Sequence, residues 1–131
     1  MPTHPIPSSA PTTAQVDADG QLVIGERRVT EWVAEFGSPL YIIDIATIRT
    51  QCRTLVSTLD NEYPNYKILY AAKANLNRGV AKLIADEGLG IDVVSGGELL
   101  TALRAEVPVS SIFFHGNNKS VEELRLAIDH G

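Results

Sequence analysis

The chain has 131 residues, of which 44% are hydrophobic and 21% charged, a composition typical of one globular domain. Eleven basic and sixteen acidic side chains give a net charge of −5, which disfavours nucleic acid as a partner. No apolar run approaches the roughly 18 residues of a membrane-spanning helix, and the single cysteine, Cys52, excludes an internal disulfide.

The first 20 residues hold four prolines and several serines and threonines, but no lysine or arginine. Such a segment buries too little apolar surface to offset its ordering entropy, so we expect a disordered tail over 1–20. It lacks the basic and apolar regions of a secretory signal and the arginines of a transit peptide. A cytoplasmic location is therefore expected.

Short elements are predicted next. Gln21–Ile24 has the pattern of a strand, and a helix is predicted from about Thr30 to Gly37, where glycine ends it. Pro39–Ile43 is a compact apolar segment, which favours a second strand.

A longer helix is predicted after Asp44, whose carboxylate suits the open amides of a helix N-terminus. From Ile45 to Leu59 apolar residues recur at intervals of three and four, as in an amphipathic helix. Cys52 lies on that apolar stripe. We interpret it as a small core residue rather than a nucleophile.

From Tyr66 onward a strand-then-helix pattern repeats. The predicted strands are Tyr66–Lys73, Gly90–Ser95 and Ile112–His115, and the predicted helix caps are Asn77, Ser95 and Ser120. Ser95 and Ser120 each open a Ser-x-x-Glu capping box. Such a repeat predicts parallel strands with right-handed crossovers, as in a doubly wound sheet or a (β/α)8 barrel.

Polar residues gather at the carboxyl ends of these strands, where both folds place reactive groups. They are Lys73, then Ser95 with Gly96 and Gly97, and then His115 with Asn117 and Asn118.

Strand alternation places Lys73 on one sheet face with Leu69 and Ala71. Desolvation there would disfavour the charged lysine and free its amine for Schiff-base chemistry. The alternative is a surface lysine at a strand end. Asp92 lies in an apolar strand, where it either pairs with Lys73 or is partly solvated.

The other polar positions also have two interpretations. Gly96 and Gly97 either admit an anion to the backbone amides or form a tight turn. His115 is a general-acid candidate or a structural histidine. Asn117 and Asn118 are loop residues that also suit side-chain hydrogen bonds.

Several motifs together resemble a known family. Tyr70–Asn75 (YAAKAN) resembles the lysine motif of pyridoxal-phosphate enzymes with an alanine-racemase-like, fold-type III barrel. Within that superfamily, Gly90–Leu99 and Phe114–Ser120 are similar to the diaminopimelate decarboxylases, as is the Gly37–Tyr41 segment. The resemblance runs from about Leu22 to Gly131.

The resemblance implies an α/β fold: the first three βα units of a (β/α)8 barrel over 61–131, preceded by a strand and helix segment over 21–60 that belongs partly to a β-domain. It implies that Lys73 holds pyridoxal 5'-phosphate as a Schiff base. The cofactor-pocket candidates are Lys73, Ala71, Asp92, Ser95, His115 and Asn117, and no metal is implied.

The implied activity is decarboxylation of meso-2,6-diaminopimelate to L-lysine and carbon dioxide, the last step of lysine biosynthesis, by a cytoplasmic homodimer. The family's Glu-Pro-Gly-Arg and Cys-Glu-Ser-Gly-Asp segments do not occur here. We therefore expect an incomplete amino-terminal part that is inactive when isolated. The alternatives are a decarboxylase of the ornithine or arginine type and a non-catalytic pyridoxal-phosphate-binding module.

Overall fold

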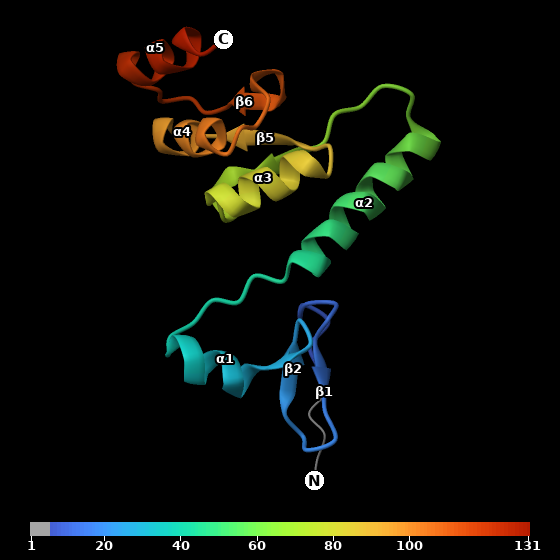
Figure 1. The fold of residues 1–131 in the computed structure, drawn as a ribbon. Coiled ribbons are helices and arrows are strands. Elements are labelled where there is room, and N and C mark those ends of the chain that lie inside the picture. Colours follow the sequence, from blue (N-terminus) through green and yellow to red (C-terminus); the bar gives the residue numbers. More distant parts are fainter. Residues whose placement is uncertain (1–5) are drawn as a thin grey trace. The chain divides into compact units, whose positions relative to one another are not determined.

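The computed structural model describes residues 6–131, which form two compact units that meet in sequence at Gln51 and Cys52 (Figure 1). The first unit contains an antiparallel sheet of three short strands in the order β1-β2-β3, followed by helix α1. Its elements are β1 (Gln15–Val16), β2 (Leu22–Ile24), β3 (Arg27–Arg28) and α1 (Val29–Phe36).

The segment predicted as a disordered tail contains a strand. Gln15 pairs with Val23 and Val16 with Leu22, so β1 is held by the β2 ladder. Asp17 closes the turn between the strands, because its Oδ1 accepts hydrogen bonds from the amides of Asp19 and Gln21. The prediction is therefore wrong for the end of 1–20, since composition does not reveal a pairing partner. Residues 1–5 lie outside the described part of the chain.

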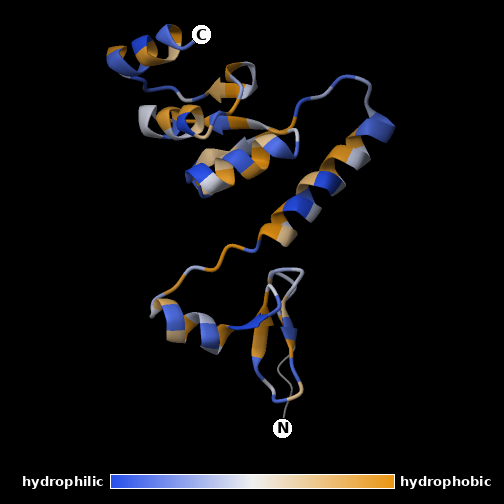
Figure 2. Cartoon of the chain, in the orientation of Figure 1, coloured by the Kyte–Doolittle hydropathy of each residue, from blue (hydrophilic) through white to orange (hydrophobic). Residues whose placement is uncertain are grey.

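The strand predicted at Gln21–Ile24 is confirmed as β2, and α1 ends at Gly37 as predicted, with φ of +83° at that glycine. The helix begins at Val29, one residue before Thr30. The predicted strand over Pro39–Ile43 is wrong. This apolar segment (Figure 2) belongs to neither sheet of the described residues, and a strand without a partner forms no ladder.

Helix α2 (Ile45–Glu62) confirms the predicted amphipathic helix and its Asp44 cap. The Asp44 carboxylate accepts hydrogen bonds from the Ala46 amide at 3.1 Å and the Thr47 hydroxyl at 2.7 Å. Cys52 is buried, with 5% of its surface exposed, as predicted for a core residue. Within residues 6–131, no helix combines the length and apolar composition that crossing a bilayer requires.

The second unit contains the predicted parallel sheet, in the order β4-β5-β6. Each strand is followed by a helix, as predicted (Figure 1). The elements are β4 (Leu69–Ala71), α3 (Arg78–Asp86), β5 (Gly90–Val93), α4 (Gly96–Arg104), β6 (Ile112–Phe114) and α5 (Val121–Asp129), with 3₁₀ turns at Ala72–Ala74 and Val109–Ser111.

The three predicted helix caps are confirmed. Asn77, Ser95 and Ser120 accept hydrogen bonds from the third amide of α3, α4 and α5 respectively. The capping box at Ser120 is complete. At Ser95 the reciprocal bond differs from the predicted box, because the Glu98 carboxylate accepts from the Val94 amide instead of the Ser95 amide.

The core of this unit lies on one face of the sheet. Ile91 and Val93 of β5 are fully buried, and α3 and α4 both pack against that strand. The opposite face is more open, since Leu69 of β4 is 37% exposed and Phe113 of β6 is 41% exposed. Successive side chains of a strand point to opposite faces, so residues that pack against the helices alternate with residues on the open face.

Candidate functional site

The register of the parallel sheet brings the predicted site residues to its open face. Ala71 pairs with Asp92, and Asp92 pairs with Phe113, so these three residues share one face. Two positions beyond Ala71 and Phe113 come Lys73 and His115. Lys73, Ser95 and His115 follow the ends of β4, β5 and β6, so these candidate residues lie at the carboxyl edge of the sheet.

Lys73 lies in a 3₁₀ turn and not on the strand itself, because β4 ends at Ala71. Tyr70 braces this turn by donating its hydroxyl hydrogen to the Asn75 carbonyl at 2.7 Å. The lysine side chain is exposed and has no hydrogen-bond or ion-pair partner among residues 6–131. We expected the Lys73 amine to be shielded from water, but the described residues leave it exposed because this face of the sheet is open.

Asp92 pairs with His115, not with Lys73. The Oδ2 atom of Asp92 lies 3.4 Å from Nδ1 of His115, and the Asp92 side chain is 24% exposed. Of the two alternatives for Asp92, the partly solvated position fits and the pair with Lys73 does not form, because the chain leaves the strand geometry after Ala71 and the lysine does not continue along the ladder. The His115 amide also donates to the Val93 carbonyl at 2.8 Å, which anchors the histidine to β5.

Gly96, the first glycine after Ser95, is held by a side chain of α5. The Gly96 amide donates to Oε1 of Glu123 at 2.8 Å, so an internal carboxylate already occupies it. The Ser95 hydroxyl is likewise engaged, accepting from the Glu98 amide at 3.3 Å. The interpretation of Gly96 as an anion-binding amide is therefore wrong, and the tight-turn interpretation fits it.

Asn117 and Asn118 lie exposed in the loop after β6, and neither has a hydrogen-bond partner among residues 6–131. The loop is closed instead by Lys119, whose Nζ donates to the Gly116 carbonyl at 2.5 Å and lies 5.0 Å from the Phe114 ring centre. The structure thus pairs His115 with Asp92, whereas Asn117 makes no hydrogen bond to either of these two residues.

Three residues with a part in this arrangement were missed from the sequence: Tyr70, Lys119 and Glu123. The Ser-x-x-Glu pattern indicated only the local half of the Glu123 role, its bond to the Ser120 amide. Tyr70 stands in the lysine motif, and that position was the only signal for it. Nothing in the spacing indicated Lys119.

Cys52 has none of the features of a reactive thiol. Burial, and then the nearby Glu87 carboxylate, raise the pKa of the Cys52 thiol, which disfavours the thiolate. Its predicted role as a core residue is consistent with this environment.

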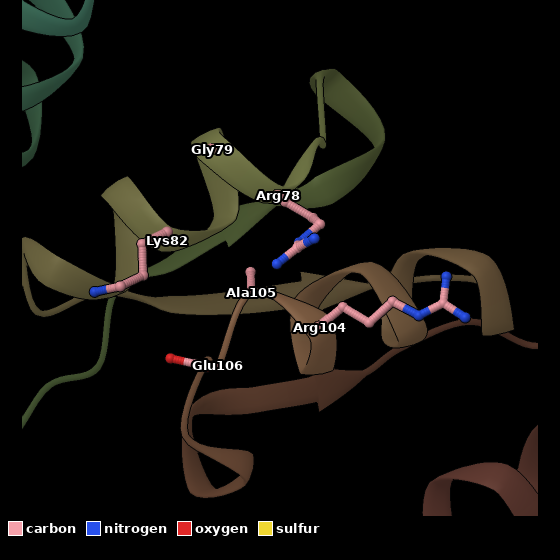
Figure 3. Close-up of a pocket in the computed structure, with 6 residues that line it drawn as sticks. All are labelled: Arg78, Gly79, Lys82, Arg104, Ala105 and Glu106. Atoms are coloured by element: carbon pink, nitrogen blue, oxygen red, sulfur yellow. The ribbon is translucent and has the colours of Figure 1, made fainter.

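A surface pocket of about 420 Å³ lies between α3 and α4, away from the predicted site residues (Figure 3). Its lining residues are Arg78, Gly79, Lys82, Arg104, Ala105 and Glu106. Arg78 points into the hollow, whereas Lys82 and Arg104 extend away from it in opposite directions in Figure 3. The three cations therefore do not converge on one ligand position.

Comparison with known proteins places this arrangement in a family. Residues 45–131 match the family model for the pyridoxal-dependent decarboxylases, pyridoxal binding domain. A diaminopimelate decarboxylase of Bacillus methanolicus is 44% identical over 118 residues, covering 90% of this chain and 27% of the relative. One from Methanothermobacter thermautotrophicus is 41% identical over 117 residues, covering 89% of this chain and 27% of the relative.

Solved structures agree. Diaminopimelate decarboxylase from M. jannaschii in complex with L-lysine matches with a TM-score of 0.78 and 34% identity, covering 90% of this chain and 28% of that one. Lysine/ornithine decarboxylase from Vibrio vulnificus matches with a TM-score of 0.69 and 28% identity, covering 79% and 27%. These matches confirm the α/β class and the likeness to the decarboxylase fold.

The chain spans only about a quarter of the length of the curated relatives it matches, 27% of the first two. The family model nevertheless covers the whole parallel sheet with its open face, including Lys73, Asp92 and His115. The chain belongs to the pyridoxal-dependent decarboxylases, and residues 45–131 correspond to the pyridoxal-binding domain of that family.

Proposed function

We propose that this protein, at its natural length, catalyses the pyridoxal-phosphate-dependent decarboxylation of meso-2,6-diaminopimelate to L-lysine and carbon dioxide. The observation that carries the proposal is an exposed Lys73 amine, with no hydrogen-bond or ion-pair partner among residues 6–131, at the same edge of the sheet as the Asp92–His115 pair. Relatives named diaminopimelate decarboxylase, at about 40% identity, support the choice of substrate.

The described residues fit the proposed cofactor at its aldehyde end. Schiff-base formation needs a primary amine that is accessible and not held in an ion pair, and within the described part of the chain Lys73 meets both conditions. When bound, the cofactor supplies an electron sink for the pair left behind as the substrate carboxylate departs.

The remaining candidate residues shape the surroundings of that amine. Ala71 contributes a small side chain in register with Asp92, which leaves space on the open face. Asp92 orients the His115 ring through Nδ1, which leaves Nε2 of the histidine to exchange a proton. Ser95 fixes the start of α4. A contact from Asn117 to the cofactor stays a prediction.

Trapping the cofactor tests the proposal directly. Borohydride reduction of the natural polypeptide incubated with pyridoxal phosphate should fix the cofactor to the peptide that contains Lys73, as read by mass spectrometry. Lys73→Ala should remove both the adduct and carbon dioxide release from meso-diaminopimelate, whereas Lys67→Ala, two residues before β4, should retain both. An adduct that survives Lys73→Ala would overturn the assignment.

The same assay separates the alternatives. A decarboxylase of the ornithine type would release carbon dioxide from ornithine faster than from meso-diaminopimelate, and the Vibrio vulnificus likeness gives that alternative its support. A non-catalytic module would form the Lys73 adduct and release no carbon dioxide from either amino acid.

The finer architecture is part of the same proposal. The strand order β4-β5-β6 supports three consecutive βα units of a (β/α)8 barrel. We further propose a cytoplasmic homodimer, with 21–60 belonging partly to a β-domain and 61–131 to the barrel. Sedimentation of the natural polypeptide at several concentrations tests the dimer.

A further inference from the structure

Glu123 connects the starts of two helices. Its Oε2 atom accepts a hydrogen bond from the Ser120 amide at 3.0 Å, which completes the capping box of α5. Its Oε1 atom accepts from the Gly96 amide at 2.8 Å, at the first residue of α4. One carboxylate therefore joins the connection after β5 to the connection after β6.

The segment between β5 and α4 is thereby held at both ends. At one end the His115 amide donates to the Val93 carbonyl at 2.8 Å, and at the other the Gly96 amide donates to Glu123. Ser95 lies between these two points, and Asp92 lies directly before them. The position of Ser95 thus depends on the Glu123 contact, whereas Asp92 directly before this segment is fixed by its pairing with β4 and β6.

The Glu123 contact leaves little room for a side chain at position 96, whereas position 97 has room for one. A Cβ atom added at Gly96 would lie 3.2 Å from Cγ of Glu123, a spacing that forces the glutamate to move. A Cβ added at Gly97 would meet nothing closer than the Ser95 hydroxyl at 4.0 Å. Gly96 is also buried, so its amide has no water to replace a lost carboxylate.

We propose that Glu123 is a positioning residue for the pyridoxal-phosphate pocket: it fixes the Val93–Gly96 segment, which carries Ser95, next to the Asp92–His115 pair and withholds the Gly96 amide from anionic ligands. This inference rests on the proposed function. It goes beyond that function by assigning the geometry of the pocket to a residue whose two carboxylate oxygens are both engaged by backbone amides.

Glu123→Gln tests the proposal in the natural polypeptide. The two amides bond different oxygens of Glu123, and glutamine replaces one of these oxygens with an NH2 group, so one amide would face a donor in place of an acceptor. We expect the dissociation constant of pyridoxal phosphate, measured by absorbance titration, to rise about tenfold, as for loss of one charge-assisted hydrogen bond. Glu122→Gln, one residue away and exposed, is the matched control and should leave it unchanged.

A purely structural role would give a different result. In that case Glu123→Gln would lower the melting temperature, yet the folded protein would bind pyridoxal phosphate with unchanged affinity, and the proposal would be overturned. Failure of the unsubstituted protein to bind the cofactor would instead overturn the proposed function itself. Failure of the positioning role therefore appears only as unchanged affinity in the Glu123→Gln variant, whereas failure of the proposed function appears already in the unsubstituted protein.

A second pair of variants serves if Glu123→Gln does not fold. Gly96→Ala retains the carboxylate but displaces it, so we expect weaker binding of pyridoxal phosphate. Gly97→Ala adds the same methyl group where there is space and should bind normally. Equal affinities for the two alanine variants would contradict the proposed role.

Discussion

Each of the two units is stabilised mainly by a different kind of interaction. Thirteen of the fourteen buried hydrophobic residues within 6–131 belong to the second unit, and Val23 is the single one in the first. The second unit therefore gains its stability from apolar burial over the parallel sheet. The first unit has too small a core to rely on the same source.

Exposed charged contacts take a larger part in the first unit. Arg28 pairs with Asp17 at 2.7 Å and also with Asp19, and Arg27 pairs with Glu35 at 2.7 Å. Such pairs contribute little individually and are screened by salt. Core substitutions should therefore affect mainly the second unit, whereas screening of ion pairs by salt should affect mainly the first.

The largest effect is expected from Ile91→Ala, because Ile91 is fully buried in the central strand β5. Removing its side-chain carbons should cost about 3 kcal/mol of unfolding free energy. Urea unfolding of the natural polypeptide measures this loss. Leu69→Ala on the neighbouring strand, at a position 37% exposed, should cost clearly less. Equal costs would show that burial does not decide the stability of this sheet.

Gly90→Ala should follow, at about 2 kcal/mol, because the added carbon has no space in the sheet. It would lie 2.7 Å from the Ser111 backbone oxygen and 2.7 Å from Cδ2 of Leu69. A backbone atom cannot move aside as the end of a side chain can. The same urea assay applies, with Gly97→Ala as the control that should be neutral or better.

Val23→Ala in the first unit should cost less than either, about 1.5 kcal/mol for two carbons. Because Val23 lies on β2, the central strand of the antiparallel sheet, its loss should be confined to that unit. Hydrogen exchange of amides in β2 and β5 measures this. Loss of protection in β5 comparable to that in β2 would contradict the separation of the two units.

The smallest effect is expected from acid acting on Asp17. Hydrogen bonds from the Gln21 amide, followed by the charge of Arg28, lower the pKa of the Asp17 carboxyl below its ordinary value of 3.8. A lowered pKa contributes stability above pH 3.8 that is lost as the pH falls through the folded-state value. Asp17→Asn should remove this acid-sensitive part. Carboxyl chemical shifts across an acid titration measure the pKa, and a value at or above 3.8 would contradict the assignment.

Helix starts in this chain were predictable because each depends on a few adjacent residues. Asn77, Ser95 and Ser120 all cap the helices that their local sequence indicated. Strand pairing was less predictable, because it depends on a distant partner. Gln15–Val16 form a strand in a proline-rich segment, whereas the more apolar Pro39–Ile43 does not.

The same distinction applies to the candidate site. The strand ends that carry Lys73, Asp92 and His115 followed from the repeating pattern and from the family motifs. The partner of Asp92 did not, because the pattern could not show that β4 would turn into a 3₁₀ helix before Lys73. The hydrogen bond from the Gly96 amide to Glu123 joins residues 27 apart in sequence, so no local pattern could predict it.

The burial of Cys52 has a practical consequence for experiments on this protein. It is the only cysteine in the sequence, and its thiol is both shielded and held in the protonated form. Maleimide reagents, which react with exposed thiolates, should therefore modify an introduced cysteine well before the native one. Tyr41→Cys, at a position 97% exposed, offers an attachment point for a fluorophore or spin label without prior removal of Cys52.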